Sequence, residues 1–144
     1  MADWAERFVA LSEYIAQWSK DPKRKVGAVI IDLDRNILAT GYNGFARGIA
    51  DDERLNDREI KLQMIVHAEA NALCAAARNG HSLKNAAIYI SRPVCSQCAA
   101  MLIQAGITSV VWRKPPSVQS RWDNNWLLSR EMLVDAGVAY FEIP

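Results

Sequence analysis

Two short segments, His67-Ala68-Glu69 and Cys95-Ser96-Gln97-Cys98, constrain the fold of this chain more than any other feature. Each stands at the start of a predicted helix. Cys95 and Cys98 are three residues apart in a first turn, so both sulfur atoms face the same side. A helix N-terminus also lowers the pKa of a thiol, which favours the thiolate that zinc binds. We therefore expect a fold that brings the beginnings of two helices together.

One histidine and two cysteines, His67, Cys95 and Cys98, would leave the fourth position of a tetrahedral zinc ion open, as in catalytic zinc sites. Cys74 lies seven residues after His67, about 10 Å along a helix axis, which is too far to share the ion. We expect Cys74 to be a buried core thiol and His81 to lie in a surface loop, with His81 still open as a remote fourth ligand. We predict one Zn²⁺ per chain; the alternative for Cys95 and Cys98 is a pair of buried thiols.

Glu69 follows His67 by two residues, a rotation of about 200° on an ideal helix. The two side chains converge only if the metal lies beyond the helix N-terminus. As a structural residue, a carboxylate in the first turn complements the helix dipole. Beside a zinc-bound water, it can instead take a proton as a base and return it as an acid. We favour this catalytic interpretation.

Strands and helices alternate along most of the chain. An apolar, β-branched run predicts a strand over residues 26–32, and Asp34-Arg35-Asn36 predicts a turn into a second strand over residues 37–42. Further strands are expected at 86–91, 107–112 and 138–141, and helices at 67–78, 95–104 and 124–135. The order predicts an α/β fold, a three-layer α/β/α sandwich with a mixed five-stranded sheet, in a single domain over residues 1–144.

Two further segments carry predictions. An apolar stripe at helical spacing predicts an N-terminal helix that packs this stripe into the core and ends at Asp21-Pro22. The stripe consists of Trp4, Phe8, Leu11, Ile15 and Trp18. Residues 43–61 combine glycines with dense charge and lack periodicity, so we expect a long loop there, and long loops inside compact domains are usually functional or disordered.

Composition excludes several classes of protein. The chain has 144 residues, of which 51% are hydrophobic, so it can fill a core. Its net charge of +1 is too small to attract the whole protein to a nucleic acid polymer or an anionic membrane. Its apolar runs are too short to span a bilayer. The N-terminal residues lack the features of a signal peptide, so we expect a reducing, cytoplasmic location, where spaced cysteines more often bind metal than form disulfides.

The chain resembles the zinc-dependent nucleotide and nucleobase deaminases, whose signature is His-x-Glu followed by Pro-Cys-x-x-Cys. The resemblance to the deoxycytidylate (dCMP) deaminase branch of that family covers nearly the whole chain. The segments that carry it, besides the two described above, are Ser19-Lys20-Asp21-Pro22, Val26-Gly27-Ala28, Gly41-Tyr42-Asn43-Gly44, residues 53–59, Asn71-Ala72 and residues 103–107. Together, in this order and spacing, they identify the chain as a member.

The resemblance implies a role for each matching residue. Zinc would be held by His67, Cys95 and Cys98, and Glu69 would take a proton from the zinc-bound water and pass protons to the cytosine ring and the leaving amine. Other contacts to the substrate would come from residues near these. The oxygen of Ser91 or a neighbouring backbone carbonyl would accept from the amine, and the Ala68 N–H would donate to O2 of the base. Asn43 would bind the sugar 3′-hydroxyl, and Val26 and Tyr42 would border the base.

Basic residues of the predicted loop would meet the phosphate of a nucleotide, since arginine suits bidentate phosphate contact. The candidates are Arg47, Arg54, Arg58 and Lys61, with Lys20 and Arg24 nearby. For any single one, a solvated surface charge is an equal alternative. Three residues depart from the family pattern: Val94 stands where proline is usual, Ala46 follows the Gly-Tyr-Asn-Gly segment in place of proline, and Trp18 replaces an arginine of regulated relatives. We therefore do not expect control by dCTP and dTTP.

The sequence leaves several functions open. The first is hydrolytic deamination of dCMP to dUMP and ammonia, which feeds thymidylate synthesis. The alternatives are the same chemistry on a nucleoside, dCTP, a free base such as guanine or cytosine, or tRNA adenosine, and a non-catalytic module that binds zinc or nucleotides. The near-neutral charge disfavours an RNA substrate. The resemblance also implies a homo-oligomer, for which an exposed Trp122 and Trp126 would be weak support, because core packing explains them equally well.

Overall fold

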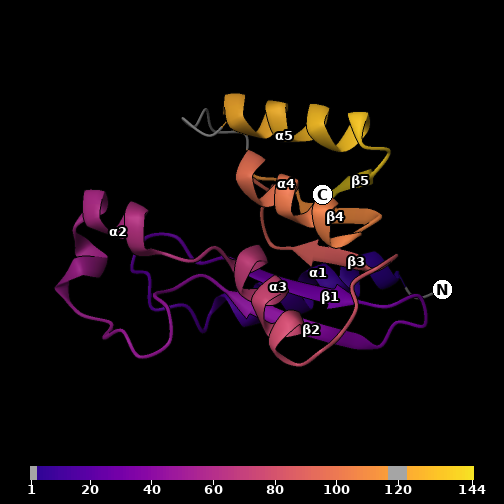
Figure 1. Cartoon of the computed structure of the whole chain (residues 1–144). Helices are drawn as coiled ribbons and strands as arrows, with labels where there is room; N and C mark the ends of the chain where they lie inside the picture. Colours follow the sequence, from indigo (N-terminus) through magenta and orange to yellow (C-terminus); the bar gives the residue numbers. More distant parts are fainter. Residues whose placement is uncertain (1–2, 117–122) are drawn as a thin grey trace.

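The structure is a computed structural model that describes residues 3–116 and 123–144 (Figure 1). The helices and strands are α1 (Trp4–Ala16), β1 (Gly27–Ile31), β2 (Ile37–Tyr42), the 3₁₀ helix η1 (Glu53–Asn56), α2 (Arg58–Met64), α3 (Ala68–Arg78), β3 (Ala87–Ile90), α4 (Ser96–Ala105), β4 (Ser109–Arg113), α5 (Asp123–Asp135) and β5 (Ala139–Ile143). Trp122 lies outside the described residues. Within the described ranges, no helix is both long and apolar enough to cross a membrane.

The sheet is mixed, with the strand order β2-β1-β3-β4-β5. β1 runs antiparallel to both β2 and β3, whereas β3, β4 and β5 are parallel to one another. α4 and α5 connect the parallel strands, because parallel neighbours need a crossover rather than a hairpin. The predicted mixed five-stranded sheet is confirmed.

Successive residues of β1 face opposite sides of the sheet, as the period of a strand requires. Val29 and Ile31 pack against Phe8 and Ile15 of α1. Ile30 belongs to the larger core under α3 and α4. α1 therefore covers one face of the sheet and α3 and α4 the other (Figure 1). The predicted three-layer sandwich is confirmed, and it sets α3 and α4 next to each other.

α1 buries only the middle of its predicted apolar stripe. The helix ends at Ala16, so Trp18 lies beyond it, and Trp4 occupies its first turn. Trp4 and Trp18 are 41% and 50% exposed, so the prediction that the two tryptophans pack in the core is wrong. The reason is that burial in α1 extends from Phe8 to Ala16, whereas Trp4 is the first residue of the helix and Trp18 lies beyond its last. Trp18 instead contacts the ring of Tyr42 at the edge of β2.

The prediction of a loop throughout residues 43–61 is wrong in its second half, which contains η1 and α2. The side chain of Asp52 accepts from the N–H of Arg54, and that of Asp57 accepts from the N–H of Ile60. Both aspartates are N-caps, which satisfy backbone donors at a helix start and make short helices possible in a charged segment.

Cys74 is exposed on α3, so the prediction of a buried core thiol is wrong. The buried face of α3 consists of Ala68, Glu69, Ala72 and Ala76, and residue 74 points away from it. His81 is exposed, as predicted.

Candidate active site

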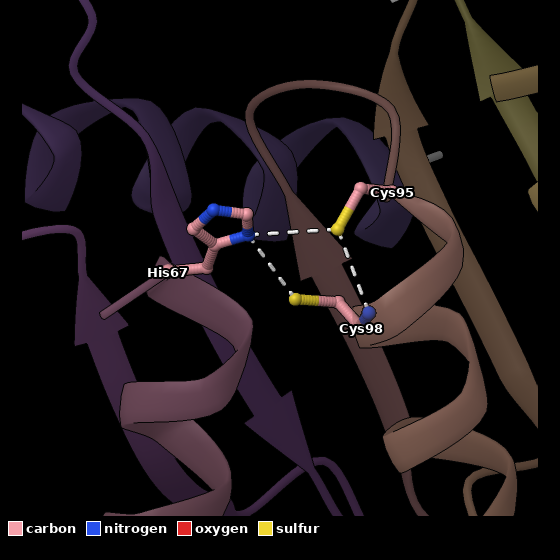
Figure 2. A group of neighbouring side chains, drawn as sticks. All are labelled: His67, Cys95 and Cys98. Carbon is pink, nitrogen blue, oxygen red and sulfur yellow. Dashed lines mark hydrogen bonds between the residues drawn. The ribbon is translucent and has the colours of Figure 1, made fainter. Parts of the chain in front are cut away.

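The beginnings of α3 and α4 place three side chains together (Figure 2). His67 is the N-cap of α3 and Cys95 is the N-cap of α4, both with extended backbone, and Cys98 lies in the first turn of α4. Gly41 of β2 makes this approach possible, because a Cβ at residue 41 would collide with the backbone of Ala68. The sequence therefore fixes the position of α3 through a glycine on the neighbouring strand.

The spacing of these three side chains fits a tetrahedral metal ion. Nδ1 of His67 lies 3.5 Å from Sγ of Cys95 and 3.4 Å from Sγ of Cys98 (Figure 2). A zinc ion with ordinary bond lengths holds a nitrogen and a sulfur ligand about 3.6 Å apart. Within residues 3–116 and 123–144, His67, Cys95 and Cys98 are the metal-ligating side chains that cluster in this way. His81 is not part of the group.

Hydrogen bonds within the cluster favour a thiolate. A hydrogen bond from Cys98, assisted by His67 and the N–H of Cys98, lowers the pKa of Cys95 to about 4. The same contact with Cys95, together with burial and nearby Glu69, raises the pKa of Cys98. The hydrogen bond with Cys95 raises the pKa of His67. The cluster thus concentrates negative charge on sulfur, which is the form that binds a metal ion.

A cavity of about 350 Å³ opens beside this cluster. His67, Cys95 and Glu69 all line it, and Glu69 is only 4% exposed. Burial raises the pKa of Glu69. Because Glu69 lies in the first turn of α3 and His67 is the residue that caps it, the two side chains reach the same space beyond the helix N-terminus, as the sequence analysis required.

The cavity contains some of the predicted substrate contacts. Val26, Asn43, Ala68 and Arg58 line it. The side-chain oxygen of Asn43 accepts from the N–H of Val26 at 2.9 Å, and its amide nitrogen donates to the carbonyl of Arg24 at 2.7 Å. Asn43 therefore holds the segment from Arg24 to Val26 against the cavity.

Four other predicted contacts lie elsewhere in the described part of the chain. Tyr42 contacts Trp18, and Ser91 accepts from the N–H of Gly27. Arg54 forms an ion pair with Asp52, and Arg47 is exposed. None of Tyr42, Ser91, Arg47 and Arg54 is among the described residues that line the cavity, so their substrate contacts stay predictions.

Sequence reasoning missed several residues of the cavity wall, among them Lys23, Arg92 and Trp126. Arg92 lies in the short segment between β3 and α4, and the end of a strand before a helix is a common place for ligand contacts, so its position was a usable signal. Trp126 is 8% exposed on α5, and nothing in its sequence neighbourhood indicated a cavity. Val94, which replaces the usual proline, is fully buried.

Comparisons with known proteins agree with this geometry. Residues 2–114 match the family model described as "Cytidine and deoxycytidylate deaminase zinc-binding region". The chain is 37% identical over 145 residues to the "Uncharacterized deaminase in luxG 3'region" of Aliivibrio fischeri, covering 100% of this chain and 96% of that protein. It is 35% identical over 116 residues to the deoxycytidylate deaminase of Homo sapiens, covering 76% of this chain and 64% of that protein.

A solved structure is also similar, the dCMP deaminase from the cyanophage S-TIM5 in complex with dCMP and dUMP. It has a TM-score of 0.76 and 25% sequence identity, and the match covers 96% of this chain and 95% of that chain. The family match over residues 2–114 includes the clustered metal-ligating side chains and Glu69. This chain therefore belongs to the cytidine and deoxycytidylate deaminase family, whose members are hydrolases that act on C–N bonds.

Proposed function

We propose that this chain deaminates dCMP to dUMP and ammonia, a reaction that supplies the precursor of thymidylate. The observation that carries the proposal is the cavity in which the metal-ligating cluster, the buried Glu69 and several basic residues meet. The similarity to a dCMP deaminase solved with dCMP and dUMP supports a nucleotide substrate.

His67, Cys95 and Cys98 would hold one zinc ion. When bound, zinc supplies a water that is acidic enough to act as a nucleophile near neutral pH. Glu69 would then move the protons: its buried carboxylate lies beside the cluster and can accept a proton and deliver it to the base and its leaving amine. The raised pKa of Glu69 favours this double role, since the protonated form persists closer to neutral pH.

The remaining cavity residues would bind the nucleotide. Val26 and the Ala68 N–H would contact the base. Asn43 would bind the sugar, because its side-chain amide can form further hydrogen bonds besides its two contacts with the backbone. Arg58 would contribute charge from α2. Lys61 is already neutralised by Asp21, with 3.1 Å between Nζ and Oδ1, so we assign it a structural role.

We also propose that the protein forms a homo-oligomer in the cytoplasm. Support comes from apolar side chains at one end of the sheet: Leu127, Leu128 and Val134 of α5 and Phe141 of the edge strand β5 are 48–63% exposed. Contiguous apolar patches are typical of an interface, and these side chains would form one if they meet on the surface of α5 and β5. Sedimentation of the purified protein tests the oligomer, and a mass equal to one chain would contradict it.

The proposed substrate is tested by measuring ammonia release from a panel of nucleotides, nucleosides and bases that carry an amino group. The panel consists of dCMP, CMP, dCTP, deoxycytidine, cytosine, guanine and adenosine, each with zinc-loaded and with metal-stripped protein. We expect dCMP to react fastest, and only after zinc loading. Faster turnover of an unphosphorylated compound would overturn the substrate, and no turnover of any compound by zinc-loaded protein would overturn the catalytic function.

A further inference from the structure

The start of α4 has only a weak cap from its own N-cap residue. The first backbone N–H groups of a helix find no partner inside the helix, and a side-chain oxygen of the N-cap residue usually accepts from one of them. The N-cap of α4 is Cys95, whose sulfur is a weak acceptor and lies 3.5 Å from the backbone nitrogen of Cys98. The same sulfur belongs to the metal-ligating cluster. The turn that carries both cysteines therefore depends on contacts from elsewhere.

Asn125 of α5 makes such a contact. Its side-chain oxygen accepts from the backbone N–H of Ser96 at 2.9 Å, and its amide nitrogen donates to the Ser96 hydroxyl at 3.0 Å. Because the backbone N–H can only donate, it is the oxygen of the amide that faces it. Ser96 is the first residue of α4, directly after Cys95 and two residues before Cys98. Asn125 thus caps, from a neighbouring helix, the turn that presents both thiols.

The helix that carries Asn125 is anchored by buried side chains. Trp126, the next residue, is 8% exposed, and Leu133, two turns later, is fully buried. The buried hydroxyl of Ser129 donates to the carbonyl of Trp126 at 2.8 Å. α5 also packs against α4. The first turn of α5 therefore cannot move relative to α4 without opening buried contacts, so Asn125 is a fixed point for Ser96.

α5 lies outside the region that the family model describes. The match ends at residue 114, and α5 begins at Asp123. The matched region includes His67, Cys95 and Cys98 but not the side chain that holds Ser96. The contact from Asn125 is therefore an addition to the shared zinc-binding region.

We infer that Asn125 is a positioning residue for the metal site: by holding the first residue of α4, it fixes the direction in which Cys95 and Cys98 present their sulfur atoms. Partners outside the ligand set orient metal ligands, and their loss typically weakens metal binding by about 10–100-fold. The inference rests on the proposed function, since it concerns the zinc ion that His67, Cys95 and Cys98 would hold.

The inference has a reciprocal consequence for α5. A contact that strengthens metal binding must itself be strengthened when the metal binds, because coupling between two equilibria is mutual. Zinc should therefore stabilise the docking of α5 on α4 through Asn125 and Ser96.

The first test is the zinc affinity of Asn125→Ala, measured by competition with a chelator. We expect zinc binding to weaken by about 10–100-fold. Asn124→Ala is the matched control, because Asn124 precedes Asn125 on the same helix and is exposed. Its affinity should stay within about twofold of wild type.

Two further variants test the hydrogen bonds themselves. Asn125→Asp should stay within about fivefold of wild-type affinity, because its carboxylate still accepts from the Ser96 N–H and the Ser96 hydroxyl can turn to donate. Ser96→Ala should weaken zinc binding less than Asn125→Ala does, since the backbone N–H of residue 96 keeps its acceptor.

Two measurements separate positioning from a general loss of stability. The absorption bands of Co²⁺ bound in place of zinc depend in intensity on tetrahedral geometry, so at saturating Co²⁺ we expect weaker bands in Asn125→Ala and wild-type bands in Asn125→Asp. Hydrogen exchange of the α5 amides should slow when zinc is added to wild type, and slow less in Asn125→Ala. A purely structural role would lower the Tm of the metal-free protein without changing zinc affinity or the Co²⁺ spectrum.

Wild-type zinc affinity in Asn125→Ala would overturn the inference, and so would equal losses of affinity in Asn124→Ala and Asn125→Ala. Failure of the proposed function is distinguishable. A protein that binds zinc tightly, loses affinity in Asn125→Ala and releases no ammonia from dCMP would contradict the deamination and support the positioning role. A wild type that binds no zinc would contradict both.

Discussion

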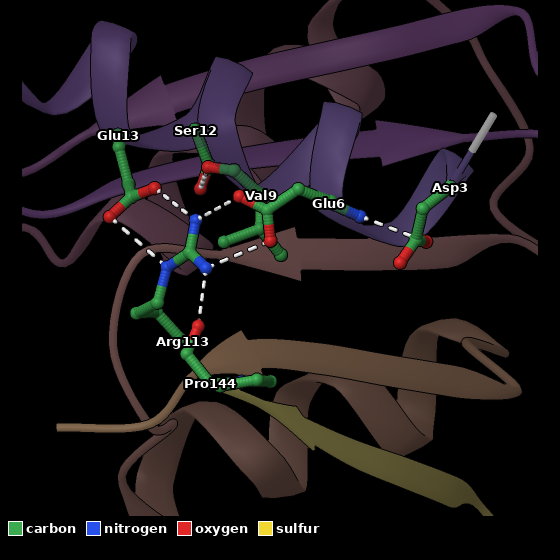
Figure 3. A network of polar contacts seen from close by, with 7 residues as sticks. All are labelled: Asp3, Glu6, Val9, Ser12, Glu13, Arg113 and Pro144. Carbon is green, nitrogen blue, oxygen red and sulfur yellow. Dashed lines mark hydrogen bonds and ion pairs between the residues drawn. The ribbon is translucent and has the colours of Figure 1, made fainter.

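Two clusters of polar side chains lie at different places in this fold, and they differ in the kinds of side chain that they bring together. On β4, Arg113 donates to both carboxylate oxygens of Glu6 and of Glu13 on α1, and to the main-chain oxygen of Pro144 (Figure 3). These contacts raise the pKa of Arg113. At the cavity, by contrast, His67, Cys95 and Cys98 offer three donor atoms to one point (Figure 2).

The difference separates a structural cluster from a functional one. The Arg113 cluster pairs opposite charges and ties the end of the chain to α1, so it needs no ligand. The cavity cluster brings two thiols and an imidazole together beside the buried carboxylate of Glu69. Donor atoms of this kind and spacing suit a metal ion, and functional sites are where side chains group in ways that the fold alone does not require.

The largest expected effect comes from Glu69→Gln. The amide keeps the shape of the side chain but cannot move a proton, so deamination should fall about 10²–10⁴-fold while zinc content is kept. Removing a buried carboxylate should leave the Tm unchanged or higher. Ammonia release and thermal unfolding measure the two effects. Glu59→Gln, on the exposed surface of α2, is the control, and similar activity in both variants would contradict the role of Glu69.

A smaller effect, on stability, is expected for Gly41→Ala. The new methyl would collide with the backbone of Ala68 and Ala72 in α3, which cannot rotate aside, at a cost of about 3 kcal/mol. The metal-ligating cluster should loosen because α3 carries His67. Gly44→Ala is the matched control, since nothing lies within 4 Å of a Cβ there. Chemical denaturation compares the two, and equal stability would show that α3 does not depend on this contact.

The smallest effect is expected for Arg113→Gln, which should lower the Tm by about 2–5 °C at neutral pH with zinc binding and activity unchanged. The hydrogen bond with Arg113 lowers the pKa of Glu6 below its ordinary 4.5. A lowered carboxyl pKa stabilises the fold above 4.5 and loses that contribution as the pH falls through the folded value. The Tm difference between wild type and variant should therefore shrink below pH 4.5; a difference that persists unchanged in acid would contradict the account.

Much of the site could be predicted from the sequence because its geometry is local. Cys95 and Cys98 share one helical turn, and His67 and Glu69 flank one helix start, so short-range spacing was sufficient. The strands were also predictable, since β1 is a continuous apolar run. Trp4 and Trp18 were misjudged because periodicity shows which face a residue occupies and not how far the sheet extends beneath it.

The rest of the cavity wall could not be predicted in the same way. Arg24, Arg92 and Trp126 are more than thirty residues apart in the sequence and meet only through the packing of α5 on α4 and of β1 on β3. The phosphate contacts were expected mainly in residues 43–61, where charge is dense, with Lys20 and Arg24 nearby. Asp52 and Asp21 balance part of that charge, which a count of basic residues does not reveal.

The most direct test of the contrast between the two clusters is a count of zinc per chain, by elemental analysis after dialysis, in wild type, Cys98→Ser and Arg113→Gln. We predict one zinc ion per chain in wild type and in Arg113→Gln, and none in Cys98→Ser, with added zinc raising the Tm of the first two only. Equal zinc content in wild type and Cys98→Ser, or no zinc in wild type, would contradict the assignment of the cavity cluster as a metal site.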